Sequence, residues 1–202
     1  MNISRGSAAI FAVLALAATP ALADDITDQL DSGKALYAKG DYAQALSELQ
    51  FAINDIQKKV SERYVAVMPA APAGWEADEP EAQSGAMLGG GQVITRHYHE
   101  QNGGDGQMTL TVSVDIPMVQ AMSAMFTNPA LISADPQAKR VRVGGDNAVL
   151  KWNAPNKSGE VTMMLGSRIL AQLEGQNLKS DAVLQDFMKN WDMKPLKTAA
   201  GL

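Results

Sequence analysis

The fold is decided by residues 92–100, QVITRHYHE, together with residues 108–116, MTLTVSVDI. Apolar and polar residues alternate along both segments, which is typical of strands with one buried face. Between them lies the sequence NGGDG at residues 102–106, whose glycines and asparagine are typical of a turn. Because a short turn joins antiparallel neighbours, we predict that the two segments form a β-hairpin.

Four more segments toward the C-terminus have the strand pattern and are joined by short turns; they are residues 139–143, 148–153, 161–165 and 169–174. Two helices are also predicted here. The first begins at Pro117, and the second, which Ser180 caps, ends near Trp191. We therefore expect an α+β sandwich domain at residues 92–197, in which two helices cover an antiparallel β-sheet.

Toward the N-terminus, residues 25–64 predict an α-helical hairpin. Lys39 and Gly40 have the composition of a helix end, and Asp41 with Gln44 has the spacing of a cap for the next helix. Apolar residues of this second helix repeat by three and four, which places them on one face; they are Leu46, Leu49, Ile53, Ile56 and Val60. An exposed face of this kind would indicate a missing partner, and a buried one a self-contained fold.

Small residues in this hairpin resemble the pattern of a single tetratricopeptide repeat. The matching positions are Gly33, the turn at residues 40–42, Ala45 and Ala52. The large aromatic residue usual near the start of the first helix is replaced by Gln29, and no second copy follows. The resemblance implies that a lone unit packs on the rest of the chain or on a partner. A plain helical hairpin with incidental small residues remains the alternative.

Residues 65–91 predict a linker rich in proline, alanine and glycine. Its first part, MPAAPAGW at residues 68–75, favours an extended backbone, and an acidic stretch and three glycines follow. Trp75 is expected to anchor this connector in a groove of the second domain, since most of its large surface is apolar. A direct role for Trp75 in partner binding is the alternative.

Residues 1–23 have the pattern of a secretory signal peptide. Arg5 precedes an apolar run at residues 8–18, and the sequence ALA at residues 21–23 is typical of a cleavage site. We expect cleavage after Ala23 and a periplasmic protein; an uncleaved N-terminal membrane anchor is the alternative. No second apolar run approaches the length of about 20 residues that a membrane span needs, so no span is expected after cleavage.

Composition excludes several classes of function. The chain has 202 residues, no cysteine and a net charge of −5. Without cysteine, disulfides, thiol catalysis and a lipidated cysteine are excluded. The negative charge argues against nucleic-acid binding, which favours a basic surface. No nucleophile motif or phosphate-binding loop occurs, so we expect neither catalysis nor a cofactor.

The sequence offers two groups of residues as candidate ligand or partner sites. His97 and His99 lie two apart on a predicted strand and would share a face, but a metal site needs a third or fourth ligand. Met118, Met122 and Met125 have helical spacing and could line an adaptable binding groove, or copper could use their thioethers. Packing against the sheet is the simpler interpretation of the methionines, and solvent-facing strand positions that of the histidines.

Several stretches of the mature chain resemble a family of small secreted proteobacterial proteins without an assigned activity. They are residues 68–75, LGGG at 88–91, IPMVQAM at 116–122 and LEG at 173–175. The order of the predicted strands is loosely similar to the PsbP-type sandwich, a fold that docks on other proteins, which implies fold-level analogy alone.

The sequence therefore predicts a non-enzymatic periplasmic module that binds a protein partner in the cell envelope. A small-ligand or metal-binding protein that uses the sandwich domain is the alternative.

Overall fold

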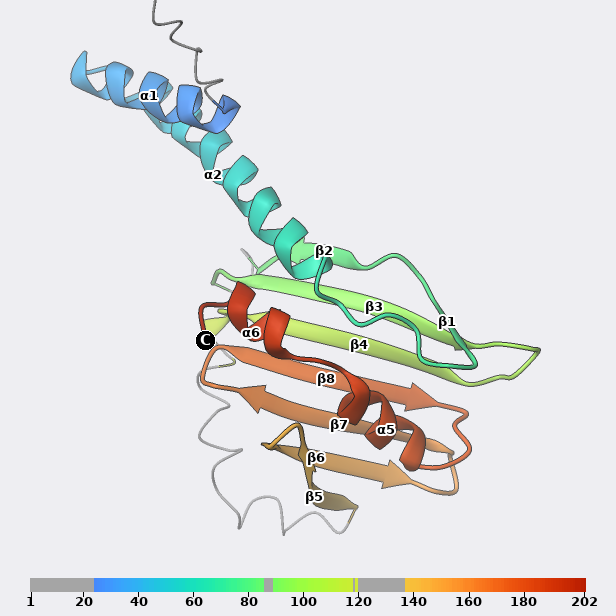
Figure 1. Cartoon of the computed structure of the whole chain (residues 1–202). Coiled ribbons are helices and arrows are strands. Elements are labelled where there is room, and N and C mark those ends of the chain that lie inside the picture. The colour runs from blue at the N-terminus through green and yellow to red at the C-terminus, as the bar shows by residue number, and fades with distance from the viewer. Residues whose placement is uncertain (1–23, 86–88, 118, 120–136) are drawn as a thin grey trace, which may run out of the picture. The chain divides into compact units, whose positions relative to one another are not determined.

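The computed structural model describes residues 24–85, 89–117, 119 and 137–202 of the chain (Figure 1). The chain divides into two compact units, with the division between Ala52 and Ile53. The first unit contains helix α1, Asp25–Ala38, and the start of helix α2, Tyr42–Val65. The second unit contains the rest of α2 and all strands. The α+β class is confirmed.

Helices α1 and α2 form the predicted helical hairpin. Asp24 caps α1, because its carboxylate accepts a hydrogen bond of 3.1 Å from the backbone N–H of Ile26. Gly40, with φ of 83°, supplies the left-handed residue that ends the first helix. Asp41 accepts a long hydrogen bond of 3.4 Å from the N–H of Gln44 at the start of α2.

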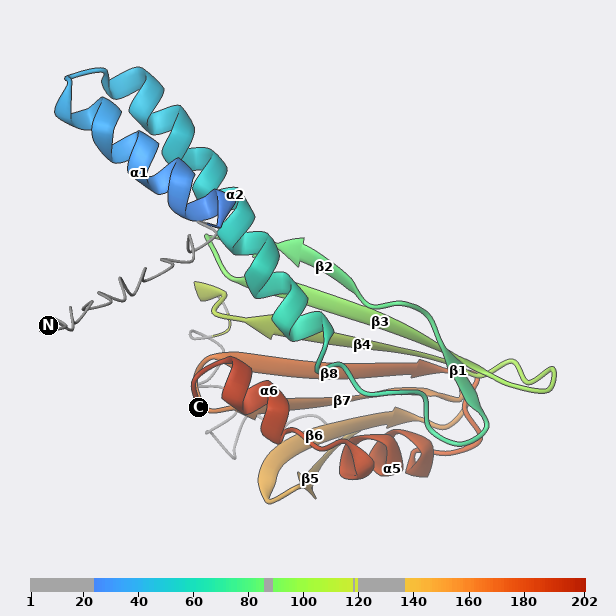
Figure 2. The same cartoon turned by 45° about the horizontal axis from the view of Figure 1, so that its top comes forward.

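The second unit is built on one antiparallel sheet of eight strands (Figures 1 and 2). Along the sheet the order is β1-β3-β4-β8-β7-β6-β5, and β2 also pairs with β3. The strands are β1 Trp75–Ala77, β2 Glu81–Ser84, β3 Gln92–Glu100, β4 Gln107–Val114, β5 Ala138–Val143, β6 Asp146–Asn153, β7 Ser158–Leu165 and β8 Ile169–Gln176.

Part of the predicted linker at residues 65–91 belongs to the sheet, which differs from the expected connector. Strand β1 pairs with one end of β3, with Trp75 opposite Glu100. Strand β2 pairs with the other end, with Glu81 opposite Thr95. All four residues of β2 are exposed, so this strand has no buried face and no apolar alternation by which to predict it.

One face of the sheet carries the main core, which helices α5, Ala182–Asn190, and α6, Lys194–Ala199, cover (Figure 2). Fully buried side chains of β3, β4 and β8 include Ile94, Leu110 and Leu173. Val60 and Tyr64 from the end of α2 also pack in this core. We call the second unit the sheet unit. It also contains a smaller buried cluster, which consists of Ile116, Val119 and Leu170.

Of the two helices predicted to cover the sheet, the second is observed as α5, and most of the first lies outside the described residues. The residue before α5 is Asp181, which makes no side-chain cap, so the prediction of Ser180 as the cap is wrong. Helix α6, with a proline in its first turn, was not predicted. Of the helix expected from Pro117, Pro117 and Val119 are helical, and the other positions fall at residues 118 and 120–136, which lie outside the described residues. Among the helices that are described, none has both the length and the apolar character to cross a membrane.

Tyr98 offers a test of how the sheet core holds the segment before β1. Its hydroxyl donates a hydrogen bond of 2.8 Å to the carbonyl of Pro69, and its ring packs edge-on against Phe187. Tyr98→Phe should lower the free energy of unfolding by about 1 kcal/mol, because it removes one part-buried hydrogen bond. Tyr98→Ala should lower it by about 3–5 kcal/mol through the cavity.

Urea unfolding followed by circular dichroism would measure both losses. Tyr37→Phe is the matched control, since Tyr37 is 66% exposed. Equal unfolding midpoints for Tyr98→Phe, Tyr37→Phe and the unaltered chain would contradict the assigned hydrogen bond.

Candidate protein-binding surface

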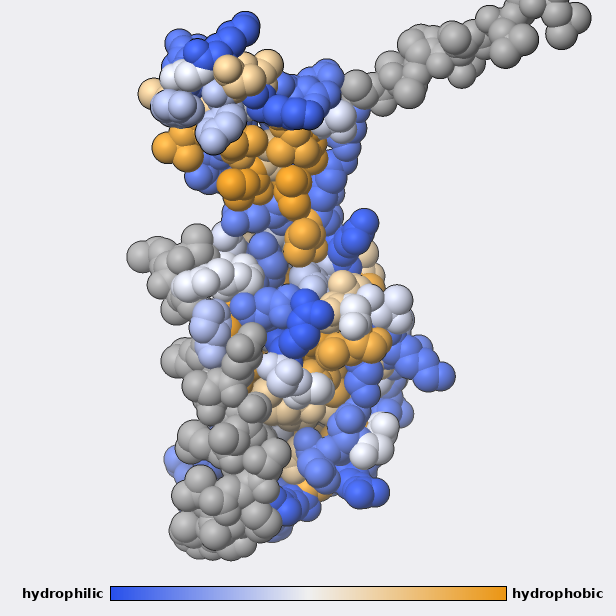
Figure 3. Space-filling model, turned by 90° about the vertical axis from the view of Figure 1, so that its left-hand side faces the viewer, coloured by the Kyte–Doolittle hydropathy of each residue, from blue (hydrophilic) through white to orange (hydrophobic). Residues whose placement is uncertain are grey.

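The helical hairpin carries large apolar side chains on its outside. We define the hairpin face as six exposed residues: Leu30, Tyr37, Tyr42, Leu46, Ile53 and Ile56. Leu46 is 69% exposed and Tyr42 is 65% exposed, values typical of charged surface residues. The apolar patch on the helices is visible in the space-filling view (Figure 3). Of the row predicted on the second helix, Leu46, Ile53 and Ile56 are exposed, and Leu49 is half-buried.

Residues of the hairpin face lie on one side because of helix geometry. On α1, Leu30 and Tyr37 are seven residues apart, and on α2, Leu46 and Ile53 are also seven apart. Seven residues make about two helical turns, so each pair points in nearly the same direction. The rings of Tyr37 and Tyr42 lie 5.5 Å apart, which joins the two helices into one surface.

Small residues explain why the large ones are left outside. At the contact between α1 and α2, a Cβ atom on Gly33 would lie 2.9 Å from the side chain of Leu49. Ala45 is 2% exposed and Ala52 is fully buried. Glycine and alanine let the helices approach closely, and Leu49 is the large apolar side chain that packs on Gly33. In α1 only Ile26 and Gly33 are buried.

On α2 the hairpin face is bordered by polar residues that carry no charge. A row of uncharged polar residues, separated by three, four and three positions, runs beside Leu46 and Ile53. The members of this row are Ser47, Gln50, Asn54 and Gln57. No charged residue is among the six residues of the face itself. Such a surface, with an apolar centre and a polar border, has the composition of a protein interface.

The same apolar row of α2 is covered at its other end. Val60 lies seven residues after Ile53 and packs against the sheet core, as does Tyr64 four residues later. Tyr64 is 5% exposed, and burial raises the pKa of its phenol. One apolar row thus has a buried end, where it packs on the sheet core, and an exposed beginning.

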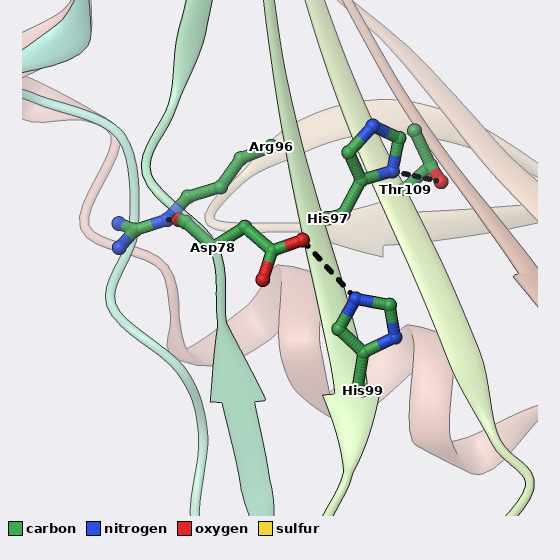
Figure 4. Close-up of polar contacts among 5 residues, drawn as sticks. All are labelled: Asp78, Arg96, His97, His99 and Thr109. Carbon is green, nitrogen blue, oxygen red and sulfur yellow. Dashed lines mark hydrogen bonds and ion pairs between the residues drawn. The ribbon is translucent and has the colours of Figure 1, made fainter.

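The two histidines do not converge on a common site (Figure 4). His97 Nδ1 lies 3.1 Å from Thr109 Oγ1 on β4. His99 Nε2 lies 3.1 Å from Asp78 Oδ2, which comes from the segment between β1 and β2. Each imidazole therefore has its own partner: Thr109 on the neighbouring strand for His97, and Asp78 for His99. Within the described parts of the chain, no group of three or more His, Asp or Glu side chains could hold a metal ion.

Arg96 and Tyr98 connect β3 to the preceding segment. Arg96 donates a hydrogen bond of 2.8 Å from Nε to the carbonyl of Asp78, and one of 2.9 Å from Nη1 to that of Pro69. Its guanidinium also lies 5.9 Å from the ring centre of Tyr98. These contacts hold the segment in place, and all acceptors are backbone carbonyls, so they supply no reactive group.

The other candidate residues predicted from the sequence, Trp75 and the three methionines, are not part of the hairpin face. Trp75 is partly buried and packs against the main core from β1. Met118, Met122 and Met125 lie outside the described residues, so the methionine groove stays a prediction. Trp75 and the two histidines belong to strands of the sheet unit, whereas the hairpin face belongs to α1 and α2.

A second feature is an apolar hollow of about 440 Å³ in the sheet unit. It lies between residues 66–72 and helix α5, and Phe187 and Trp191 border it. The indole Nε1 of Trp191 is buried and has no hydrogen-bond partner among the described residues. A buried N–H without an acceptor is uncommon in proteins, so this position favours an additional acceptor.

Sequence reasoning found Leu46, Ile53 and Ile56 by their spacing but could not decide whether they are buried. It did not assign Leu30, Tyr37 or Tyr42 to the same surface. The available signal was the set of small residues at the helix contact, which implies that large residues point elsewhere. The hollow had no comparable signal, because residues 66–72 have no periodic pattern.

Comparisons with known proteins assign no family. No protein-family model matches the chain, and searches of curated proteins and of solved structures find no match.

The close helix contact generates a prediction. Gly33→Val should weaken the hairpin by about 1–3 kcal/mol, because the new side chain collides with Leu49 and overpacks the contact. Far-UV circular dichroism during thermal unfolding would detect the earlier loss of helix.

Ala35→Val is the matched control, since Ala35 lies two residues away on an exposed position of the same helix. It should cost only the small difference in helix propensity, below about 1 kcal/mol. If both variants melt alike, the helices are not in close contact at Gly33.

Proposed function

We propose that this chain is a non-enzymatic, protein-binding accessory module of the cell envelope, and that the hairpin face is its docking surface. The single observation that carries the proposal is the exposure of six large apolar side chains on one side of α1 and α2. Monomeric soluble proteins rarely leave such a contiguous patch uncovered unless it binds something.

Two further observations support this proposal. The sheet unit has its own extensive core, so the hairpin face is not needed to complete it. The secretory pattern at residues 1–23 supports a periplasmic location, and the single repeat-like hairpin is a type of unit that packs on a neighbour.

A partner-capture experiment tests this function. The mature chain, from Asp24, is immobilised and exposed to periplasmic extract from its own bacterium, next to Leu46→Glu and Phe51→Gln variants. Leu46→Glu should lose at least tenfold of the captured protein, because binding would bury a carboxylate against apolar residues.

Phe51→Gln is the matched control. Phe51 is also exposed, at 57%, and lies on α2, but five residues from Leu46 and thus on a different side of the helix. It should capture as much as the unaltered chain. Equal capture by Leu46→Glu would contradict docking through the hairpin face.

The apolar hollow favours small-ligand binding by the sheet unit as a second candidate. Its volume lies within the range of small-molecule sites. The ligand class would be a small apolar molecule. Neither histidine belongs to this hollow.

Thermal unfolding with acetophenone and with ethylbenzene tests this candidate. Both compounds are small and largely apolar, so binding in the hollow should raise Tm by an amount that grows with the concentration of the compound. No rise with either compound would contradict the candidate.

A further inference from the structure

We propose that the occupant of the hairpin face is a second copy of this chain, so that two hairpins pack face to face in a twofold dimer. This inference rests on the proposed function and names the partner for the same surface. It follows from three properties of the face: its area, the chemistry of its border and the absence of charge at its centre.

The area of the hairpin face is sufficient for a dimer. The exposed fractions of its six residues together amount to roughly three whole side chains, which is about 600 Å² on one chain. Two chains would bury about 1,200 Å², the lower end of the range for stable, specific protein interfaces. Leu49, which is half-buried beside the face, adds to this area.

The border of the face is compatible with itself. Across a twofold axis each patch meets an identical patch, so a border of one charge would meet the same charge. Here the row on α2 has one hydroxyl and three amides, and each of these groups is both donor and acceptor. On α1 the nearest charges are Asp31 and Lys34, one of each sign, which can pair between copies.

The centre of the face also favours association with a copy. It contains two leucines, two isoleucines and two tyrosines, and tyrosine hydroxyls at an interface can reach water or an amide. Two antiparallel helices from each copy would form a four-helix bundle, in which each apolar face covers the other. The dimer would then carry two sheet units, each available to a further ligand.

Mass measurement by size-exclusion chromatography with light scattering tests the proposal on the mature chain. The unaltered chain should have twice the mass of one chain at micromolar concentration. Leu46→Glu should be monomeric, since dimerisation would bury each carboxylate against apolar residues of the other copy. Phe51→Gln, on a different side of α2, should stay dimeric.

Folding is checked on the same samples. Leu46 is 69% exposed, so Leu46→Glu should keep the far-UV circular dichroism of the monomer. Tyr42→Lys serves as a second variant of opposite charge and should also be monomeric.

Each outcome bears on the proposal. A dimer that Leu46→Glu and Tyr42→Lys disrupt while Phe51→Gln does not supports it. A dimer that survives both variants overturns it, because the interface lies elsewhere. A monomeric unaltered chain that captures an envelope protein through Leu46 overturns the dimer but leaves the docking function intact. A monomeric chain that captures nothing overturns both.

Discussion

The packing of Val60 and Tyr64 against the sheet core is the interaction on which the interpretation of helix α2 depends. These residues belong to one apolar row that begins at Leu46 and repeats every three or four residues. At its end the row packs in the main core through Val60 and Tyr64. At its beginning Leu46 is 69% exposed, and Ile53 and Ile56 are also exposed.

The sheet and the helical hairpin differ in how they are stabilised. The sheet unit buries many large side chains between the strands and helices α5 and α6, so it needs no disulfide. The hairpin has small residues at the contact between α1 and α2, among them Gly33 and Ala45. Short helices are marginal in water, and tertiary packing normally provides most of their stability. Covering the hairpin face would supply that packing, which links stability of the hairpin to binding.

Much of the fold could be predicted from the sequence, because strands β3 and β4 alternate in polarity and the α2 row repeats as a helix. Strand β2 could not be predicted, since all its side chains are exposed and only backbone pairing with β3 defines it. Helix α6 is too short for a periodic pattern. Half of the candidate surface was predictable, because Leu46, Ile53 and Ile56 follow one row, but the exposure of that row was not, since it depends on what packs against these residues. The separation of His97 and His99 onto different partners likewise depends on Asp78 and Thr109.

The most direct measurement is the accessibility of position 46 in solution. The chain contains no cysteine, so a Leu46→Cys variant has one thiol, and its reaction rate with a maleimide reports exposure. If the hairpin face is exposed in one chain and covered in the dimer, Leu46→Cys should react fast at nanomolar protein and more slowly as the protein concentration rises. Phe51→Cys should react fast at every concentration. Slow labelling of Leu46→Cys at every concentration would contradict the account, because the chain itself would then cover the hairpin face.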